Sequence, residues 1–237
     1  MSVIVISPKC SSKSARYLAE NLNAAYGNPY RDSIQTSNYG VVINFGVSVP
    51  ISAHKIINKP QTVINAVDKL RTFKLLKGTD AECVPWTTDP KVAIDWYKAG
   101  NKIVARTTTT GNRSAGTTII SDLEGINLEN YVLFSGYVHH NHEYRVNVVG
   151  GKIIDIIEKT VNKETDTFDM SVVKDKTIHK EMQPIANAVT KNLGLDFYGI
   201  DILKAKNGKL FLLEVNSAPA LFGQPGVKFI EAMKGLI

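Results

Sequence analysis

Two acidic residues and an amide lie close together near the end of the chain, in the stretch YGIDILKAKNGKLFLLEVNSAPAL. Its Asn207-Gly208 dipeptide lies between two apolar runs and favours a tight two-residue turn between antiparallel strands. Such a turn puts Asp201 directly opposite Glu214, and it puts Asn216 on the same face as Glu214 because side chains alternate along a strand. The segment therefore predicts a hairpin that gathers three oxygen-bearing side chains.

Two carboxylates directly opposite each other on a hairpin repel, so the fold needs something that neutralises them. Two carboxylates and an amide oxygen form a hard, oxygen-only set that suits Mg²⁺ held jointly with phosphate oxygens. The alternative is a surface hairpin with solvated acids, but the neighbouring isoleucines, leucines and valines indicate a buried one. We therefore predict a metal site made of Asp201, Glu214 and Asn216.

The elements that position this hairpin begin with a small α/β lobe. Residues 3–7 and 41–50 are apolar runs typical of buried strands. Between them, Ser12 or Ser14 is placed to cap a helix that continues to Gly27.

The middle of the chain predicts helices and a hairpin. Helical periodicity runs through 57–78, and 89–100 has Asp89 as N-cap, a proline in the first turn and a glycine at the end. Strands at 102–106 and 117–121 flank the polar, glycine-bearing loop 107–116.

The last third predicts the remaining strands and helices. A strand at 131–138 is followed by a hairpin with Gly150-Gly151 as its turn. We expect a polar loop over 161–180, and a helix over 181–195 that is kinked near Pro184.

The pattern D-x(12)-E-x-N with a following S-x-P resembles the metal-binding segment of the ATP-grasp superfamily. The nearest likeness is to D-alanine–D-alanine ligases and to ribosomal-protein-modifying glutamate ligases, over roughly 58–221. DKLRTFKLL followed by VPW resembles a helix and strand of the same ligases. The chain also resembles compact ATP-grasp proteins of bacteriophage genomes.

The resemblance implies an α/β (α+β) ATP-grasp fold, in which two α+β lobes sandwich ATP. The implied division is a small α/β lobe at 1–58, a subdomain with a glycine-rich lid at 59–134, and a subdomain with the metal site at 135–237.

By the same resemblance, several residues would bind the nucleotide. Arg106 and Lys69 would hold phosphates, and Glu143 would accept hydrogen bonds from the ribose. KIVARTTTTGNRSAGTTI resembles the flexible loop that closes over the phosphates, and LFSGYVHHNHEYRVNVV resembles the hinge that meets the adenine. The remaining implied contacts are Gly111, Arg113 and Gly116 in the loop, Phe134, Ser135, Tyr137 and Val138 in the hinge, and Lys159.

Two departures from the family pattern concern the catalytic groups. D-alanine ligases carry an arginine two residues before the first metal carboxylate, where this chain has Gly199. Arg145 resembles an arginine of the glutamate ligases and is the candidate to replace it, together with Asn216 and Ser217 as catalytic residues. A two-residue turn at Gly150-Gly151 puts Lys159 on the face opposite Arg145, so these two assignments conflict.

The resemblance implies an ATP- and Mg²⁺-dependent ligase (with Mn²⁺ as a possible substitute) that activates a carboxylate donor as an acylphosphate for an amine or thiol acceptor. The alternatives are a phosphotransferase of the same fold and a nucleotide-binding module without turnover. The net charge of +6 is spread along the chain, which disfavours nucleic acid. The run HHNH lacks the spacing typical of zinc sites. The absence of an apolar stretch of about 20 residues disfavours a membrane partner, and we expect a cytoplasmic protein, in the host cytoplasm if phage-encoded.

Overall fold

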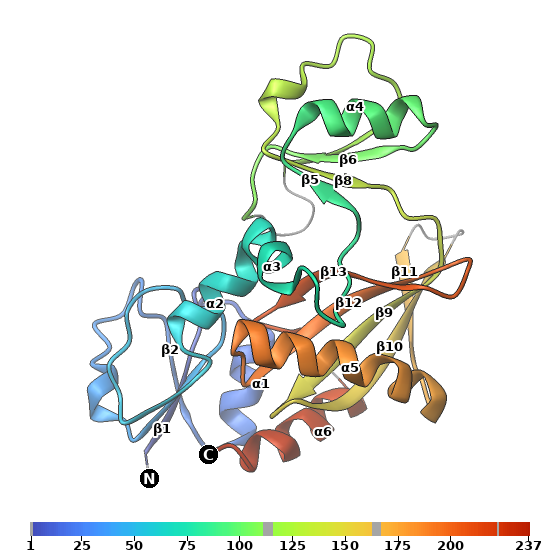
Figure 1. Ribbon diagram of the computed structural model, residues 1–237. Helices are drawn as coiled ribbons and strands as arrows, with labels where there is room; N and C mark the ends of the chain where they lie inside the picture. The colour runs from blue at the N-terminus through green and yellow to red at the C-terminus, as the bar shows by residue number, and fades with distance from the viewer. Residues whose placement is uncertain (1, 111–115, 163–166, 222) are drawn as a thin grey trace.

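The computed structural model describes residues 2–110, 116–162, 167–221 and 223–237, which form three β-sheets with their helices. Figure 1 shows them as separate bodies: the N-terminal sheet at the lower left, a small sheet covered by α4 at the top, and the largest sheet below it. No helix among the described residues is long and apolar enough to span a membrane.

The N-terminal sheet is parallel, in the order β2-β1-β3-β4. Its elements are β1 (Val3–Ile6), α1 (Lys13–Asn21), β2 (Ala25–Gly27), the short 3-10 helix η1 (Thr36–Asn38), β3 (Val41–Asn44) and β4 (Lys55–Ile57). Ser12 caps α1, as one of the two predicted alternatives, by accepting a hydrogen bond from the Ala15 N–H. The predicted continuation of α1 to Gly27 is wrong, because the chain turns at Asn23, whose φ is 51°, and then joins the sheet as β2.

Two short helices replace the single predicted helix over 57–78, namely α2 (Pro60–Val67) and α3 (Lys69–Leu76). Asp68 breaks the helix because its backbone is extended, and its carboxylate accepts a hydrogen bond from the Arg71 N–H to cap α3. The break makes Lys69 the first residue of α3.

The small sheet has the order β5-β8-β6-β7 and contains the predicted hairpin. Its elements are β5 (Trp86–Thr87), α4 (Pro90–Lys98), β6 (Ile103–Arg106), β7 (Thr117–Ile120), the 3-10 helix η2 (Leu128–Asn130) and β8 (Leu133–Gly136). The predicted boundaries of α4 are confirmed, with Asp89 as N-cap and Gly100 at a φ of 84° beyond its end.

The largest sheet is antiparallel, in the order β11-β10-β9-β12-β13. It comprises β9 (His140–Val149), β10 (Lys152–Asn162), β11 (Thr167–Val172), β12 (Phe197–Ala205) and β13 (Leu210–Asn216), with the helices α5 (Lys176–Leu193) and α6 (Gly223–Lys234). The predicted loop over 161–180 is wrong, because β10 extends into it, β11 pairs with β10, and α5 begins in it. The sequence pattern does not predict β11, because β11 is an edge strand whose apolar residues Met170 and Val172 are exposed and give no buried face.

The two faces of this sheet have different environments. Val146, Ile200 and Ile202 face a core that includes residues of α3 and α5. On the other face, α6 and the N-terminal lobe cover one end, where the rings of Phe45 and Phe197 stack with centroids 5.8 Å apart. Arg145, Asp201 and Glu214 lie side by side in register on the rest of that second face.

Candidate functional site

The β12–β13 hairpin places Asp201 opposite Glu214, as predicted, although by a different route. The loop has three residues, 206–208, so that Lys204 pairs with Leu210, and Gly208 adopts a φ of 84°. Between Asp201 and Ile202 the register shifts by one residue and restores the predicted pairing. The two-residue turn was wrong, and the carboxylate pair follows from a bulge that compensates for it.

A second bulge removes the conflict between Arg145 and Lys159. The β9–β10 hairpin has the predicted two-residue turn, but its register shifts between Ile153 and Asp155. One extra residue in β10 turns every later side chain of that strand to the other face. Lys159 therefore lies on the same face as Arg145, and the prediction of opposite faces is wrong.

These strands assemble a row of charges across the open face of the sheet. Arg145 and Asp201 are register partners, and the guanidinium of Arg145 binds both carboxylate oxygens, with Nη2 2.7 Å from Oδ2. The Lys159 ammonium lies 3.2 Å from Asp201 Oδ1 and 2.7 Å from Glu143 Oε1. Burial raises the pKa of Asp201, and the Arg145 and Lys159 cations oppose that shift.

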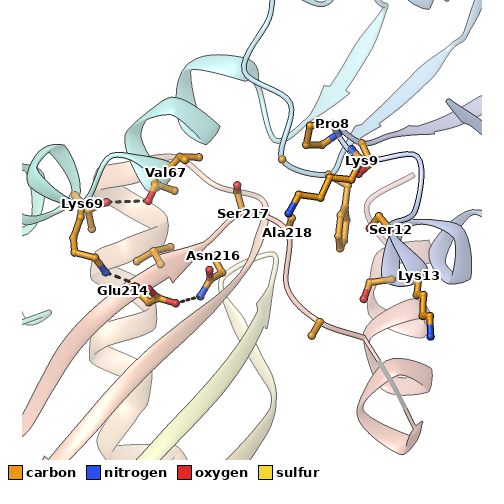
Figure 2. A pocket seen from close by; sticks show the side chains of 18 of the residues that line it. Pro8, Lys9, Ser12, Lys13, Val67, Lys69, Glu214, Asn216, Ser217 and Ala218 are labelled. Atoms are coloured by element: carbon orange, nitrogen blue, oxygen red, sulfur yellow. Dashed lines mark hydrogen bonds and ion pairs between the residues drawn. The ribbon is translucent and has the colours of Figure 1, made fainter. Parts of the chain in front are cut away.

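Glu214 lies at the other end of this row, where it meets Lys69. The Lys69 ammonium is 3.2 Å from Glu214 Oε2, and the Asn216 amide donates to Glu214 Oε1 at 3.0 Å (Figure 2). Burial alone would raise the pKa of Glu214, but Lys69 and the hydrogen bonds outweigh it and hold the pKa at about 2. Burial also lowers the pKa of Lys69, against the attraction of Glu214.

The donor set itself fits a hard cation, because Asp201, Glu214 and Asn216 offer oxygen atoms from two adjacent strands. In the structure, however, side-chain cations already neutralise both carboxylates. A metal at this place would therefore compete with Arg145, Lys159 and Lys69 for the same oxygens.

A cavity of about 190 Å³ lies beside this row, between the small sheet and the large one. Arg106 is one of its lining residues, and its Nη1 donates to Thr117 Oγ1 while its buried Nε has no hydrogen-bond partner. Burial lowers the pKa of Arg106, and Glu214 opposes that effect. The other residues predicted for the nucleotide that line this cavity are Lys69, Ser135, Tyr137, Val138 and Glu143.

A larger cavity, of about 850 Å³, opens on the other side of Lys69. Figure 2 shows its two walls: Lys69, Glu214, Asn216 and Ser217 on one side, and residues 8–13 on the other. Ser217 is buried, and the adjacent Ala218 lies against Gly46 of the N-terminal lobe. Lys69 lines both cavities and therefore connects them.

Some predicted residues lie apart from these cavities. Phe134 is fully buried in the core of the small sheet and lines neither cavity. Gly116 has a φ of 68° and accepts a hydrogen bond from the Thr107 N–H. Gly111 and Arg113 lie outside the described residues.

The space beside Gly199 is filled from the neighbouring strand. A Cβ atom at Gly199 would lie 3.1 Å from Arg145 Cδ and 3.2 Å from Pro219 Cβ. The side chain of Arg145 thus packs over Gly199, and little space is left there for a side chain.

Sequence reasoning missed two groups of lining residues. The apolar walls of the smaller cavity resemble ordinary strand residues in the sequence, and they are Val104, Ile119, Leu203 and Leu213. The loop 7–12 between β1 and α1 was not identified as a cavity wall, although a polar loop after a buried parallel strand is a common place for ligands.

A family model described as a RimK-like ATP-grasp domain matches residues 107–236, which is more than half of the chain. Among curated proteins, a probable alpha-L-glutamate ligase of Enterobacter sp. (strain 638) is 28% identical over 185 residues. A ribosomal protein bS6–L-glutamate ligase of Salmonella paratyphi B is also 28% identical over the same length. Each match covers 70% of this chain and 61% of the relative, so the chain spans about three fifths of the length of these proteins.

Solved structures similar to this chain have the same fold. The ATP-grasp ligase PsnB in complex with a minimal precursor superposes with a TM-score of 0.73 at 14% identity, over 99% of this chain and 98% of PsnB. D-alanyl-alanine synthetase A of Vibrio cholerae superposes with a TM-score of 0.71 at 14% identity, over 100% and 93%. These likenesses confirm the predicted ATP-grasp fold.

Proposed function

The chain belongs to the RimK-like ATP-grasp family, and from this membership and the geometry of its site we propose that it is an ATP- and Mg²⁺-dependent ligase. The reaction that we propose joins a carboxylate to an amine or a thiol. The observation that carries the proposal is the position of Lys69, beside Glu214 and between two cavities. One cavity suits a nucleotide and the other suits the molecules that are joined.

We assign the smaller cavity to the nucleotide. Its apolar walls suit a purine ring, and the hinge residues 135–138 line the same cavity. The buried, unpartnered Nε of Arg106 is a donor that a phosphate oxygen would satisfy. Arg106 and Lys69 would then hold phosphates, and Glu143 would bind the ribose. On this assignment the parts 59–134 and 135–237 form the two halves of the nucleotide site.

In the proposed reaction, an oxygen of the donor carboxylate attacks the γ-phosphorus of ATP, which yields an acylphosphate and ADP. The amine or thiol then attacks the acyl carbon, loses a proton and expels inorganic phosphate. Mg²⁺, held by Asp201, Glu214 and Asn216, would neutralise charge on the phosphates. Arg145 and Lys159 lie on the same face and would stabilise the transferred phosphoryl group. Asn216 and Ser217 line the larger cavity and would orient the acyl group.

The substrates of similar proteins are consistent with this reaction. The names of the curated relatives state L-glutamate ligation, in one case to ribosomal protein bS6. The solved PsnB and MdnC structures contain precursor peptides. A peptide or protein end together with an amino acid is therefore our proposed class of acceptor and donor. ATP consumption of this kind fits the cytoplasm, which we propose as the compartment.

The decisive experiment measures nucleotide binding first and chemistry second. Mg-ATP should raise the melting temperature. The free energy of unfolding should rise by about 2.7 kcal/mol when ATP is present at 100 times its dissociation constant. When peptide and amino-acid mixtures are added, hydroxylamine should trap the acylphosphate as a hydroxamate while ADP forms. ADP formation with phosphate transferred to a hydroxyl would indicate a phosphotransferase instead, and binding without ADP formation would indicate a module without turnover. The absence of any melting shift with millimolar Mg-ATP would disprove nucleotide binding.

A further inference from the structure

The larger cavity has an unbalanced charge on the wall of the N-terminal lobe, across from Lys69, Glu214 and Asn216. Among its lining residues, the charged ones are three lysines and a single acid. Glu214 is already paired with Lys69. Lys9 and Lys13, both on the N-terminal lobe, have no ion-pair partner among the described residues. The cavity therefore holds positive charge that the protein itself does not balance.

The two lysines differ in direction. Figure 2 shows the side chain of Lys9 extending from the loop after β1 toward Ala218 and Ser217, while the ammonium of Lys13 points away from the cavity. Lys9 thus faces the segment that carries Asn216 and Ser217. A molecule in this cavity would therefore contact the Lys9 ammonium on one wall and the charged groups Lys69 and Glu214 on the opposite wall.

The topology of the N-terminal sheet independently makes this wall a ligand-binding position. In the order β2-β1-β3-β4, the connection after β1 leads to β2 on one side, and β3 lies on the other. The crevice beyond the carboxyl ends of β1 and β3 is the point where the strand order reverses, and ligands of open parallel sheets bind at such points. Ser7 follows β1, Phe45 and Gly46 follow β3, and all three line the cavity.

The two walls are fixed relative to each other. The Leu221 N–H donates to Ser14 Oγ at 2.9 Å, across more than 200 residues of sequence. Gly46 has a φ of 91°, and a Cβ atom there would lie 3.1 Å from Ala218 Cβ, so the lobe approaches the Ser217 segment as closely as a glycine allows. A fixed cavity of this kind can discriminate substrates by where their charges lie.

We propose that Lys9 binds an anionic side-chain group of the substrate, so that the amino acid or peptide held in this cavity carries a side-chain carboxylate or phosphate besides the group that reacts. The proposal rests on the assignment of the larger cavity to the joined molecules. The reacting end would lie near Lys69 and Asn216, and the anionic group would lie at the N-terminal lobe.

The test compares amino acids with an anionic side chain and amino acids with a neutral one. Binding of L-glutamate against L-glutamine, and of O-phospho-L-serine against L-serine, is measured by calorimetry with and without Mg²⁺ and a nonhydrolysable ATP analogue. The charged member of at least one pair should bind tenfold or more tightly than the neutral one. The glutamate pair reports a carboxylate site and the phosphoserine pair reports a phosphate site.

Three variants make the test specific to Lys9. Lys9→Met should remove the preference for the charged probe, and Lys9→Arg should retain most of it because the charge remains. Lys13→Met is the matched control and should keep the wild-type preference. Affinity for the ATP analogue should stay within twofold in all three, so a failure of nucleotide binding is seen separately. Equal binding of the charged and neutral members in both pairs, absence of binding by both charged probes, or an unchanged preference in Lys9→Met would overturn the proposal.

Discussion

At the scale of single residues, the candidate site is a set of charges that neutralise one another. Three carboxylates, Glu143, Asp201 and Glu214, meet Lys69, Arg145 and Lys159. A phosphate-bearing ligand would take up the cations and leave the carboxylates free for a metal. We therefore propose that the site accepts metal and nucleotide together.

This arrangement predicts that metal binds poorly without nucleotide. Mn²⁺ titrated alone should bind at least tenfold more weakly than Mn²⁺ titrated with ADP present. Lys159→Met should raise the affinity for Mn²⁺ alone about tenfold, or about 1.4 kcal/mol, because one positive charge near Asp201 is removed. Electron paramagnetic resonance of free Mn²⁺ measures the effect of ADP and the effect of Lys159→Met on the affinity for Mn²⁺. Lys204→Met is the matched control, because Lys204 pairs with Glu181 instead. Equal affinity with and without ADP would contradict the prediction.

A second residue-scale prediction concerns a buried polar pair beside the charge row. The Asn147 amide donates to Asp155 Oδ1 at 2.8 Å, while Asn147 Oδ1 and Asp155 Oδ2 are buried without partners. Burial raises the pKa of Asp155 above 3.8, against its hydrogen bond and the charges of Lys228 and His179. The ionised form is therefore disfavoured in the folded state, and stability is lost as the pH rises from about the unfolded pKa through the folded one.

Asp155→Asn should stabilise the protein at pH 7 by about 1 kcal/mol, because an amide can donate to Asn147 Oδ1 without carrying charge. The gain should shrink as the pH falls through the raised folded pKa of Asp155 toward its unfolded pKa, because protonation removes the buried charge from the folded wild-type protein. Urea unfolding of the wild-type protein and the variant between about pH 4 and pH 7 measures this difference in the free energy of unfolding. A variant that is less stable than wild type at pH 7 would contradict the pairing that we infer.

At the scale of elements, the β-bulges decide which side chains reach the site. Deletion of Ile154 should remove the extra residue and restore an unbroken register, while Lys159 stays opposite Glu143 and on the face of the site. We therefore expect the deletion alone to leave nucleotide affinity within about twofold of wild type. Adding Lys159→Met to the deletion should then lower the affinity by tenfold or more, as it does in the wild-type background, because Lys159 is still present in the site. A tenfold loss from the deletion alone would show that the bulge itself, and not only the strand pairing beyond it, directs Lys159.

The same elements show what the sequence could and could not predict. The Gly150-Gly151 and Asn207-Gly208 signals identified both hairpins, because glycine at positive φ is a local requirement. The two bulges leave no such signal, since an extra residue in a strand is stabilised by tertiary packing. Asp201 and Glu214 were paired correctly because two deviations in register cancel, whereas Lys159 was misplaced because only one occurs.

At the scale of the whole molecule, a buried asparagine is one of the contacts that hold the N-terminal lobe against the largest sheet. Asn58 Oδ1 accepts hydrogen bonds from the N–H groups of Asp196 and Phe197, at 2.7 and 3.2 Å. Its amide donates to the Phe197 carbonyl at 2.8 Å. Asn58 is fully buried and has a φ of 60°, a conformation that asparagine tolerates better than most residues.

Replacement of Asn58 should therefore destabilise the molecule as a whole. In Asn58→Ala, two buried N–H groups and a carbonyl lose their partner, which costs about 1–3 kcal/mol for each unsatisfied group before relaxation. The left-handed backbone adds about 1–2 kcal/mol. We expect a loss of at least about 3 kcal/mol in the free energy of unfolding, measured by urea denaturation.

Asn23→Ala is the matched control, because Asn23 also has a positive φ, of 51°, yet is exposed and makes no side-chain hydrogen bond in the described part of the chain. The difference between the two variants isolates the bonds between the lobe and the sheet. Equal losses would mean that backbone conformation alone accounts for Asn58, and that the lobe is held by its apolar contacts around Phe45.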